Sequence, residues 1–276
     1  MSKGPELFSN FARVAGEVLT KDYSTEQRFS VASQSDTGVT LISTAAKKGG
    51  LSTGDIAAQY KYKNTAVGLI VDTASNISTS LTVTDILPST KAIASWRYPD
   101  YNSGKIEVQY LHKHASFTTA VGLNKSPSVD VSATIGTPYV AFGTNASYKL
   151  ESGAFTKYDA GVSLTKPNFG GSVVLTDKGD AVKVSYFHHV DELKKGTAVG
   201  EITRKFSTNE NTLTVGGSYT IDSLTTVKAK LNNHGNLATV LQHEFAPKSF
   251  LTISGTFDAL AMQKLPKFGL SLSLRP

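Results

Sequence analysis

Basic side chains recur at every second position in many segments of this 276-residue chain. Lys228 and Lys230, for example, alternate with the apolar residues Val227, Ala229 and Leu231. A row of ammonium and guanidinium groups facing water creates a positive potential, which raises the local concentration of anions. We therefore expect the chemistry of this sequence to be electrostatic and spread over a wall rather than held in one reactive motif.

The alternation indicates which basic residues share a face, because neighbouring residues of a β-strand point to opposite sides. The basic residues predicted on the water-facing side are Arg28, Lys61, Lys63, Lys91, Arg97, Lys105, Lys149, Lys157, Lys183, Lys205, Lys228 and Lys230. The acidic residues predicted there are fewer, namely Asp72, Glu107, Asp130, Asp159, Glu201 and Glu244. Such a wall admits ions of both signs but favours anions, and the preference weakens with salt because the Debye length is ~10 Å at 0.1 M.

Other motifs give little support for catalysis or metal binding. His188 and His189 are adjacent, so in a strand they point to opposite faces and cannot share one ion. Gly49 and Gly50 are not followed by the Gly-Lys-Ser/Thr and helix of a phosphate-binding loop, and the chain has no cysteine. No Ser/His/Asp constellation stands out, and no aromatic array accompanies the lysines as nucleic-acid binding would need. We expect a protein that is not an enzyme and has no cofactor and no metal site.

The composition excludes a membrane protein built from helices. Hydrophobic residues make up 39% of the chain and charged residues 18%. The apolar runs, such as Val67 to Val71, are as long as a strand and far shorter than the ~20 residues of a transmembrane helix. The N-terminus, Met1 to Glu6, lacks the apolar core of a secretory signal, which predicts synthesis in the cytosol and insertion of the complete chain.

Alternation of polar and apolar residues, interrupted by turn residues, predicts about nineteen strands. They lie near residues 27–34, 38–46, 52–62, 65–73, 77–86, 90–98, 103–112, 115–124, 128–136, 139–148, 154–165, 168–176, 181–189, 196–206, 211–219, 224–233, 236–245, 249–257 and 267–275. The gaps are short, so neighbouring strands are expected to pair as antiparallel hairpins. The prediction is a single domain over residues 1–276, with an N-terminal helical segment at 1–23 and a β-barrel at 24–276.

The polar sides of these strands are rich in Thr, Ser and Gly, which favours a membrane barrel over a soluble sandwich. A tilted strand needs about 9–11 residues to cross the hydrocarbon, close to the predicted lengths. A sheet edge cannot stay unpaired in lipid, so the sheet must close, and an odd number of strands requires one parallel pair. Because barrels of about 16–18 strands enclose an aqueous channel, we expect a closed, all-β transmembrane barrel with a water-filled lumen. A soluble β-domain that binds a ligand or partner is the alternative.

The first residues break the alternation and predict an amphipathic helix from Glu6 to Leu19. The apolar residues at helical spacing are Leu7, Phe11, Val14 and Val18. About fourteen residues span roughly 21 Å, too short to cross a bilayer, so the helix is expected in or near the lumen, with a membrane-surface helix as the alternative. In the lumen it would narrow the pore and place Arg13 and Lys21 in the ion path. It could pack there on the few apolar lumen positions, such as Ile42, Ile70, Ile93 and Val240.

Several stretches of the chain carry a resemblance to one family. They are Gly4-Pro5, Lys21-Asp22-Tyr23, Ser103 to Tyr110, Tyr219 to Ser223, Val227 to Asn233, Pro247 to Phe250 and Gly269 to Leu272. Together they resemble the eukaryotic mitochondrial porins, the voltage-dependent anion channels, and in particular the plant-type members. The resemblance implies nineteen strands and a voltage-gated, weakly anion-selective pore of the mitochondrial outer membrane. Small hydrophilic metabolites, nucleotides such as ATP and ADP, phosphate and inorganic ions would cross this pore by diffusion.

The resemblance also implies partners and binding residues. Membrane lipid would surround the barrel, and homo-oligomers, docking of cytosolic kinases and a location in plastid or other membranes are further expectations. The basic positions linked to nucleotide contact in the family correspond to Arg13 and Lys21. The positions associated with nicotinamide nucleotide in animal members correspond to Asn236, Leu237, Ala238, Ser254 and Asp258.

The sequence departs from other members of that family at two places. Asn236 to Thr239 stands where many members carry an apolar run, and Thr73 stands where animal members often carry a lipid-facing Glu. Functions tied to that carboxylate are therefore not expected. A protein-import barrel is a structural alternative that the resembling stretches disfavour.

Overall fold

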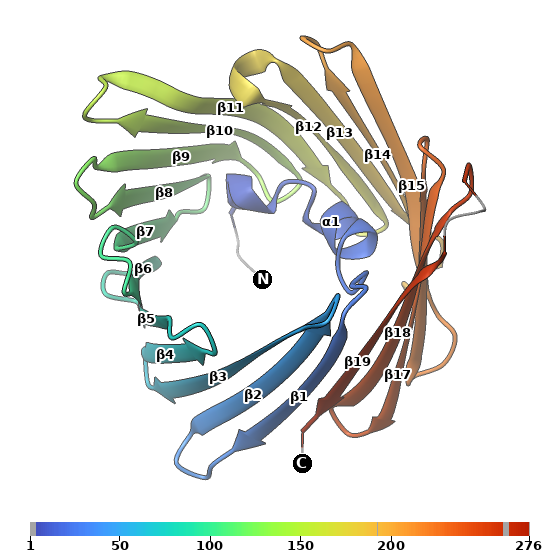
Figure 1. Ribbon diagram of the computed structural model, residues 1–276. Helices are drawn as coiled ribbons and strands as arrows, with labels where there is room; N and C mark the ends of the chain where they lie inside the picture. The colour runs from blue at the N-terminus through green and yellow to red at the C-terminus, as the bar shows by residue number, and fades with distance from the viewer. Residues whose placement is uncertain (1–3, 192, 262–264, 276) are drawn as a thin grey trace.

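The computed structural model describes residues 4–191, 193–261 and 265–275, and in these residues nineteen strands form one closed sheet (Figure 1). Each strand pairs with its neighbours in the sequence, so the order around the barrel follows the chain. The strands are β1 (Gln27–Gln34), β2 (Val39–Lys48), β3 (Leu51–Tyr62), β4 (Thr65–Asp72), β5 (Ile77–Thr84), β6 (Thr90–Tyr98), β7 (Lys105–Leu111), β8 (Ala115–Gly122), β9 (Ser128–Gly136), β10 (Val140–Lys149), β11 (Ala154–Thr165), β12 (Phe169–Thr176), β13 (Ala181–His189), β14 (Gly196–Lys205), β15 (Glu210–Thr220), β16 (Thr225–Asn232), β17 (Asn236–Ala246), β18 (Ser249–Asp258) and β19 (Lys267–Leu274). A one-turn 3-10 helix, η2 (Asp177–Gly179), connects β12 to β13.

The observed strands agree closely with the predicted ones. β1, β6, β9, β11 and β13 have the predicted bounds, and the others differ by at most two residues at either end. The agreement has a physical reason. Each strand has one apolar and one polar face, so the alternation marks its length, while Gly, Pro, Asp and Asn mark the turns.

The first and last strands close the barrel by pairing in parallel. Gln27 lies opposite Leu270, and the register continues to Val31 opposite Leu274. The other neighbouring pairs are antiparallel. With nineteen strands, β1 and β19 run in the same direction, so only a parallel pair leaves no free edge. The expected parallel closure is confirmed.

The outer face of the barrel is apolar. On β19, Phe268 is 61% exposed and Leu270 is 47% exposed, while Gly269 between them faces inward against the backbone of Ser24. Soluble domains bury most side chains of this kind, and a large exposed apolar surface indicates contact with another apolar phase. The outer face therefore fits a barrel surrounded by lipid.

The N-terminal segment lies inside the barrel, beside the inner face of the sheet (Figure 1). It contains a 3-10 helix, η1 (Phe8–Asn10), and a short α-helix, α1 (Arg13–Leu19). The expected helical segment in the lumen is confirmed, but its regular α-helix is shorter than the predicted Glu6 to Leu19. The helix is interrupted at Ala12, whose φ of 61° is left-handed. None of the described helices is long or apolar enough to span a membrane.

The interruption lets the segment pack on two separate patches of the inner wall. Phe8 and Phe11 pack on Ala141 of β10 and Val174 of β12. The second cluster consists of Ala15, Val18, Leu19, Phe187 of β13 and Val199 of β14. Neither cluster includes the expected partners Ile42, Ile70, Ile93 and Val240. The first three lie on β2, β4 and β6, across the lumen from the helix (Figure 1).

Candidate functional site in the lumen wall

Two lysines of β16 hold the N-terminal segment against the wall. Lys228 Nζ lies 2.9 Å from Asp22 Oδ2, in the linker between α1 and β1. Lys230 Nζ donates a hydrogen bond of 2.6 Å to the carbonyl oxygen of Leu19, the last residue of α1. A cation at this end of a helix satisfies a free carbonyl group and complements the helix dipole. Both lysines point inward, as the alternation predicts, and both contact protein groups there.

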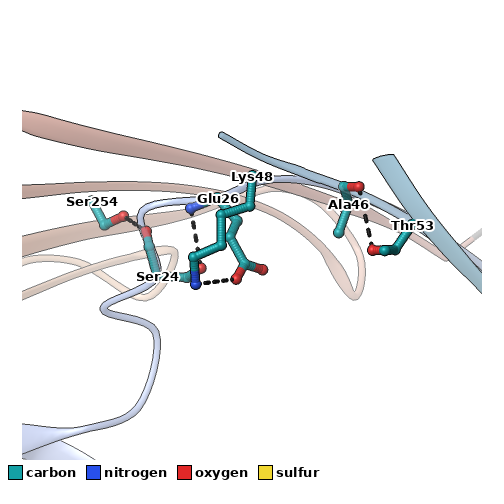
Figure 2. A network of polar contacts seen from close by, with 6 residues as sticks. All are labelled: Ser24, Glu26, Ala46, Lys48, Thr53 and Ser254. Carbon is teal, nitrogen blue, oxygen red and sulfur yellow. Dashed lines mark hydrogen bonds and ion pairs between the residues drawn. The ribbon is translucent and has the colours of Figure 1, made fainter. Parts of the chain in front are cut away.

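Polar contacts also fix the end of the linker where it enters β1 (Figure 2). Ser254 Oγ of β18 donates a hydrogen bond to the carbonyl oxygen of Ser24. Lys48 Nζ, at the end of β2, lies 2.9 Å from Glu26 Oε1. Three strands that are distant in the sequence, β2, β16 and β18, therefore hold one short linker.

Tyr23 is enclosed between the linker and the wall. Its ring centroid lies 4.3 Å from Lys230 Nζ, in a cation–π contact. Burial, with a smaller contribution from the charge of Asp22, raises the pKa of Tyr23 to about 12. Its hydroxyl is buried without a hydrogen-bond partner among the described residues. Tyr23 is therefore neutral at physiological pH and anchors the linker through its ring.

Most of the other inward lysines between β7 and β14 lie beside carboxylates. Lys157 Nζ is 2.9 Å from Asp159 Oδ2, and Lys183 Nζ is 2.9 Å from Glu201 Oε2. The longer contacts are Lys105 to Glu107 (3.7 Å), Lys105 to Asp130 (3.9 Å), Lys149 to Glu151 (3.7 Å) and Lys205 to Asp177 (3.9 Å). Lys105 is shared by two carboxylates and each of the other lysines faces one, so this part of the wall is not uniformly positive. A count of basic and acidic residues could not reveal this pairing.

Four further predicted wall cations have no carboxylate within ion-pair distance in the described part of the chain. They are Arg28, Lys61, Lys91 and Arg97. Strand register and cavity lining put them on the inner face. Arg97 Nε donates a hydrogen bond of 3.2 Å to Ser78 Oγ on β5.

Lys63 departs from the predicted wall set. It lies in the turn between β3 and β4, with a left-handed φ of 49°. Its Nζ lies 5.3 Å from the ring centroid of Tyr62, which stacks on Tyr60 on the outer face. The prediction that Lys63 lines the lumen is wrong, because the strand has ended and the alternation no longer decides the direction of the side chain.

The two basic residues expected to contact nucleotides lie at either end of α1. Arg13 Nη1 is 3.9 Å from Glu17 Oε1, and both side chains are more than half exposed. Lys21 is exposed in the linker and makes no ion pair with the described residues. Such an exposed ion pair is weak, so both cations are accessible to an anion in the lumen.

Glu6 fixes the start of the N-terminal segment, and the alternation gave no indication of this role. Ser163 Oγ of β11 donates a hydrogen bond of 2.7 Å to Glu6 Oε1, and Ser116 Oγ of β8 donates one of 3.3 Å to the Glu6 carbonyl oxygen. Burial raises the pKa of Glu6, and the hydrogen bond from Ser163 and the charge of Arg13 oppose this shift. Glu6 precedes both observed helices, so the predicted helical pattern did not indicate this role and only its contacts identify it.

The five positions expected for nicotinamide nucleotide do not share one face. Asn236 lies opposite Asp258, and Ala238 and Ser254 are buried on the inner face. Leu237 lies opposite Phe257 on the outer face and is 36% exposed. The expectation for Leu237 is therefore wrong, because adjacent residues of β17 point to opposite sides.

Taken together, a closed sheet with an apolar outer face and a charged inner face defines a membrane barrel with an aqueous lumen. The lumen holds open space beside the N-terminal segment: a cavity of about 520 Å³ is lined by Phe8 and Ser9 of η1 and by inner-face residues of β7 to β11. This class of protein passes small polar solutes by diffusion.

The family is shown by comparison with known proteins. Residues 4–269 match the family profile described as eukaryotic porin, and the chain belongs to this family. It is 55% identical to mitochondrial outer membrane protein porin 2 of Arabidopsis thaliana over 276 residues, covering 100% of both chains. It is 56% identical to mitochondrial outer membrane protein porin 5 of Oryza sativa subsp. japonica over 274 residues, covering 99% of both.

Two further similarities complete the comparison. The chain is 43% identical to the outer plastidial membrane protein porin of Pisum sativum over 277 residues, covering 100% of both chains. A solved structure of a Rhodopseudomonas blastica porin triple mutant aligns with 85% of this chain and 93% of its own, at 11% identity and a TM-score of 0.48. Family and fold define a diffusion pore for metabolites and ions and indicate a channel rather than an enzyme. The alternatives of a soluble β-domain and a protein-import barrel are not supported.

Proposed function

We propose that this chain is a voltage-gated, weakly anion-selective pore of the mitochondrial outer membrane, without catalytic activity. Small hydrophilic metabolites, phosphate, inorganic ions and nucleotides such as ATP and ADP would cross it by diffusion. The location rests on relatives named as mitochondrial outer membrane porins, and a relative named as plastidial supports plastid membranes as a further location. The observation that carries the anion preference is the set of inward cations without carboxylate partners: Arg28, Lys61, Lys91 and Arg97.

Planar-bilayer recording tests this function. Purified, lipid-inserted protein is expected to give discrete current steps, with reversal potentials in a KCl gradient that show preference for chloride. The preference should fall at 1 M salt, where the Debye length is ~3 Å. Folded, inserted protein that gives no steps would contradict the pore, whereas steps with cation preference would contradict the anion selectivity alone.

Voltage gating would require charge to move across the membrane field. Moving one charge through the full field changes the free energy by about 2.3 kcal/mol per 100 mV, so displacement of a few charges on the helix or adjacent wall is sufficient. An engineered disulfide between Val18→Cys on α1 and Val199→Cys on β14, which belong to one buried cluster, would hold the helix in place. Closure at high voltage is expected to disappear in the oxidised protein and to return after reduction. Unchanged closure would exclude displacement of the helix.

We further propose contacts with nucleotide at Arg13 and Lys21, where both side chains are exposed. Arg13→Gln combined with Lys21→Gln should weaken the reduction of current by millimolar ATP, while reduction by a neutral polymer should not change. For nicotinamide nucleotide, we propose contacts only at the inner-face positions Asn236, Ala238, Ser254 and Asp258.

Homo-oligomers and docking of cytosolic kinases are proposed from the family resemblance. Sedimentation measurements test the oligomers, and pull-down measurements test the docking of kinases.

A further inference from the structure

Two groups of inward lysines differ in whether they form ion pairs. Between β7 and β16, the inward lysines in ion pairs are Lys105, Lys149, Lys157, Lys183, Lys205 and Lys228. Lys61 of β3 and Lys91 of β6 make no ion pair in the described residues. These two lie in the part of the sheet across the lumen from α1 (Figure 1).

The groups around Lys61 and Lys91 are mainly neutral and polar. Lys61 lines a cavity of about 410 Å³ together with Gln59, Ser80 and Thr82. Lys91 lies opposite Gln109 of β7, and Thr82 lies on β5, between β3 and β6 in the sheet. Hydroxyl and amide groups can hydrogen-bond an anion beside the two ammonium groups.

Carboxylates on this side of the barrel form no ion pair with Lys61 or Lys91 in the described residues. Glu107 Oε1 accepts a hydrogen bond of 2.6 Å from Gln109 Nε2, and its Oε2 faces Lys105 at 3.7 Å. Asp55 precedes Lys61 by six residues on β3, which corresponds to about 20 Å along a strand. Asp72 lies opposite Asp55 on β4, at the same distance from Lys61. Asp85, in the loop before β6, lies near Lys91, since its N–H donates to the carbonyl oxygen of Thr90, but the two side chains form no ion pair among the described residues.

The other two unpaired cations have acidic neighbours in their surroundings. Arg28 lines a cavity with Asp22 and Glu26. Arg97 lies opposite Ser78 of β5, and Ser78 lies opposite Ile70 of β4. Asp72 is the next inward residue after Ile70, so it lies near Arg97. Among these four cations, Lys61 and Lys91 therefore have the least acidic surroundings.

A nearby opposite charge determines how far a lysine's electrostatic potential reaches into the lumen. The potential of an ion pair falls off faster with distance than that of a single charge, because the two opposite terms nearly cancel beyond their separation. A single charge acts over about one Debye length, ~10 Å at 0.1 M salt. An anion in the lumen is therefore attracted to Lys61 and Lys91 more than to the paired lysines.

We infer that Lys61 and Lys91 determine the anion preference and make the inner faces of β3 to β6 the anion path of the pore. The inference rests on the proposed function. It identifies the part of the barrel wall that produces the anion preference. The paired lysines from β7 to β16 stabilise the wall and the docked helix, and they contribute little to selectivity as intact pairs.

Thiol labelling at two matched positions tests this inference, because the natural chain has no cysteine. Thr82→Cys reports on the β3–β6 wall. Thr203→Cys reports on the paired wall, since Thr203 lies on β14 opposite Lys183 and between Glu201 and Lys205. Each variant is treated, in lipid vesicles, with an anionic sulfonatoethyl and a cationic trimethylammonioethyl methanethiosulfonate. The ratio of the two rates reports the local potential, and differences in accessibility largely cancel.

The expected ratio of anionic to cationic rates is roughly fivefold higher at Thr82→Cys than at Thr203→Cys in 0.1 M salt, and this difference should disappear at 1 M. Adding Lys61→Gln and Lys91→Gln to Thr82→Cys should abolish the excess and lower the chloride preference in bilayers. The matched control removes a complete pair, Lys183→Gln with Glu201→Gln, and should leave both the Thr203→Cys ratio and the selectivity unchanged.

Equal ratios at the two positions, or a Thr82→Cys ratio that survives the loss of both lysines, would overturn the inference. Such a result in a protein that still conducts and prefers chloride leaves the proposed function intact. Absence of conductance in the parent protein contradicts the proposed function instead, and it does so whatever the labelling ratios are.

Discussion

Lys228 and Asp22 form a largely buried ion pair, with 2.9 Å between Nζ and Oδ2, that joins β16 to the linker between α1 and β1. The side chains are 12% and 25% exposed, so solvent screens the pair less than an exposed one. The same strand supplies Lys230, which caps the end of α1 through the Leu19 carbonyl. One strand thus fixes both the end of the helix and the start of the linker.

Lys228→Gln should loosen the docked helix. The loss of a charged hydrogen bond in this largely buried site costs about 1 kcal/mol or more, which corresponds to at least about a fivefold rise in the undocked fraction. The measurement is the rate at which a water-soluble thiol reagent modifies Val18→Cys, a position that is buried in the docked state, and this rate should rise by a similar factor. Lys183→Gln is the control, since its partner Glu201 lies on β14 and not in the N-terminal segment. Equal effects of the two variants would show that Lys228 has no special role in docking.

Gly143→Ala should displace η1 from the wall. A Cβ at Gly143 would lie 2.6 Å from Phe8 Cδ2 and 3.2 Å from Phe11 Cζ, so the aromatic pair must move, at a cost of about 1–3 kcal/mol. Hydrogen exchange at the backbone amides of residues 8–11 should become at least severalfold faster. Gly200→Ala is the control, because a Cβ there meets no atom within 4 Å. Unchanged exchange in Gly143→Ala would mean that the phenylalanines repack without leaving the wall.

Docking of the N-terminal segment should strengthen as the pH falls. Burial raises the pKa of docked Glu6 above its ordinary value of 4.5, so the docked state binds a proton more readily than the displaced state. The docked fraction should therefore be lowest at neutral pH, rise as the pH falls through the docked pKa, and reach its maximum below 4.5. Spin labels at Ser9→Cys and Ser132→Cys, which both line the cavity beside η1, measure this fraction.

Glu6→Gln is the matched variant for that experiment. It keeps an oxygen that can accept the hydrogen bond from Ser163 but removes the titrating charge. The distance distribution between the spin labels should then lose its dependence on pH between 4 and 7. A profile identical to that of the parent would assign the pH response to another group.

Val108→Lys should destabilise the barrel because it puts a charge against lipid. Val108 lies near the middle of β7 and is 41% exposed on the outer face. A lysine facing lipid near the bilayer midplane costs about 2–4 kcal/mol. Thr118→Lys is the control, since Thr118 lies on the adjacent strand and lines a lumen cavity. Denaturant titration in lipid vesicles gives both free energies of unfolding, and equal values would contradict the assignment of the two faces.

The strand positions and their two faces were predictable because both depend on local periodicity. Alternation, turn residues and segment length placed nineteen strands within two residues of their observed ends. The odd count predicted the parallel pair of β1 and β19, since a barrel in lipid leaves no edge. The inward direction of Lys228 and Lys230 followed from the same alternation.

The tertiary structure decided what those side chains contact. The break at Ala12, the docking of Phe11 against β10 and β12, and the fixing of Glu6 by Ser163 join residues far apart in the chain, and no local period encodes such contacts. Lys63 shows that the alternation predicts side-chain direction only within a strand, because the alternation stops where a turn begins. The pairing of Lys183 with Glu201, and the lack of a partner for Lys61, depend on strand register and side-chain direction across the closed sheet. The sequence by itself therefore determined a barrel with a basic inner face, and only the closed structure determined which of those charges are free to act on an anion.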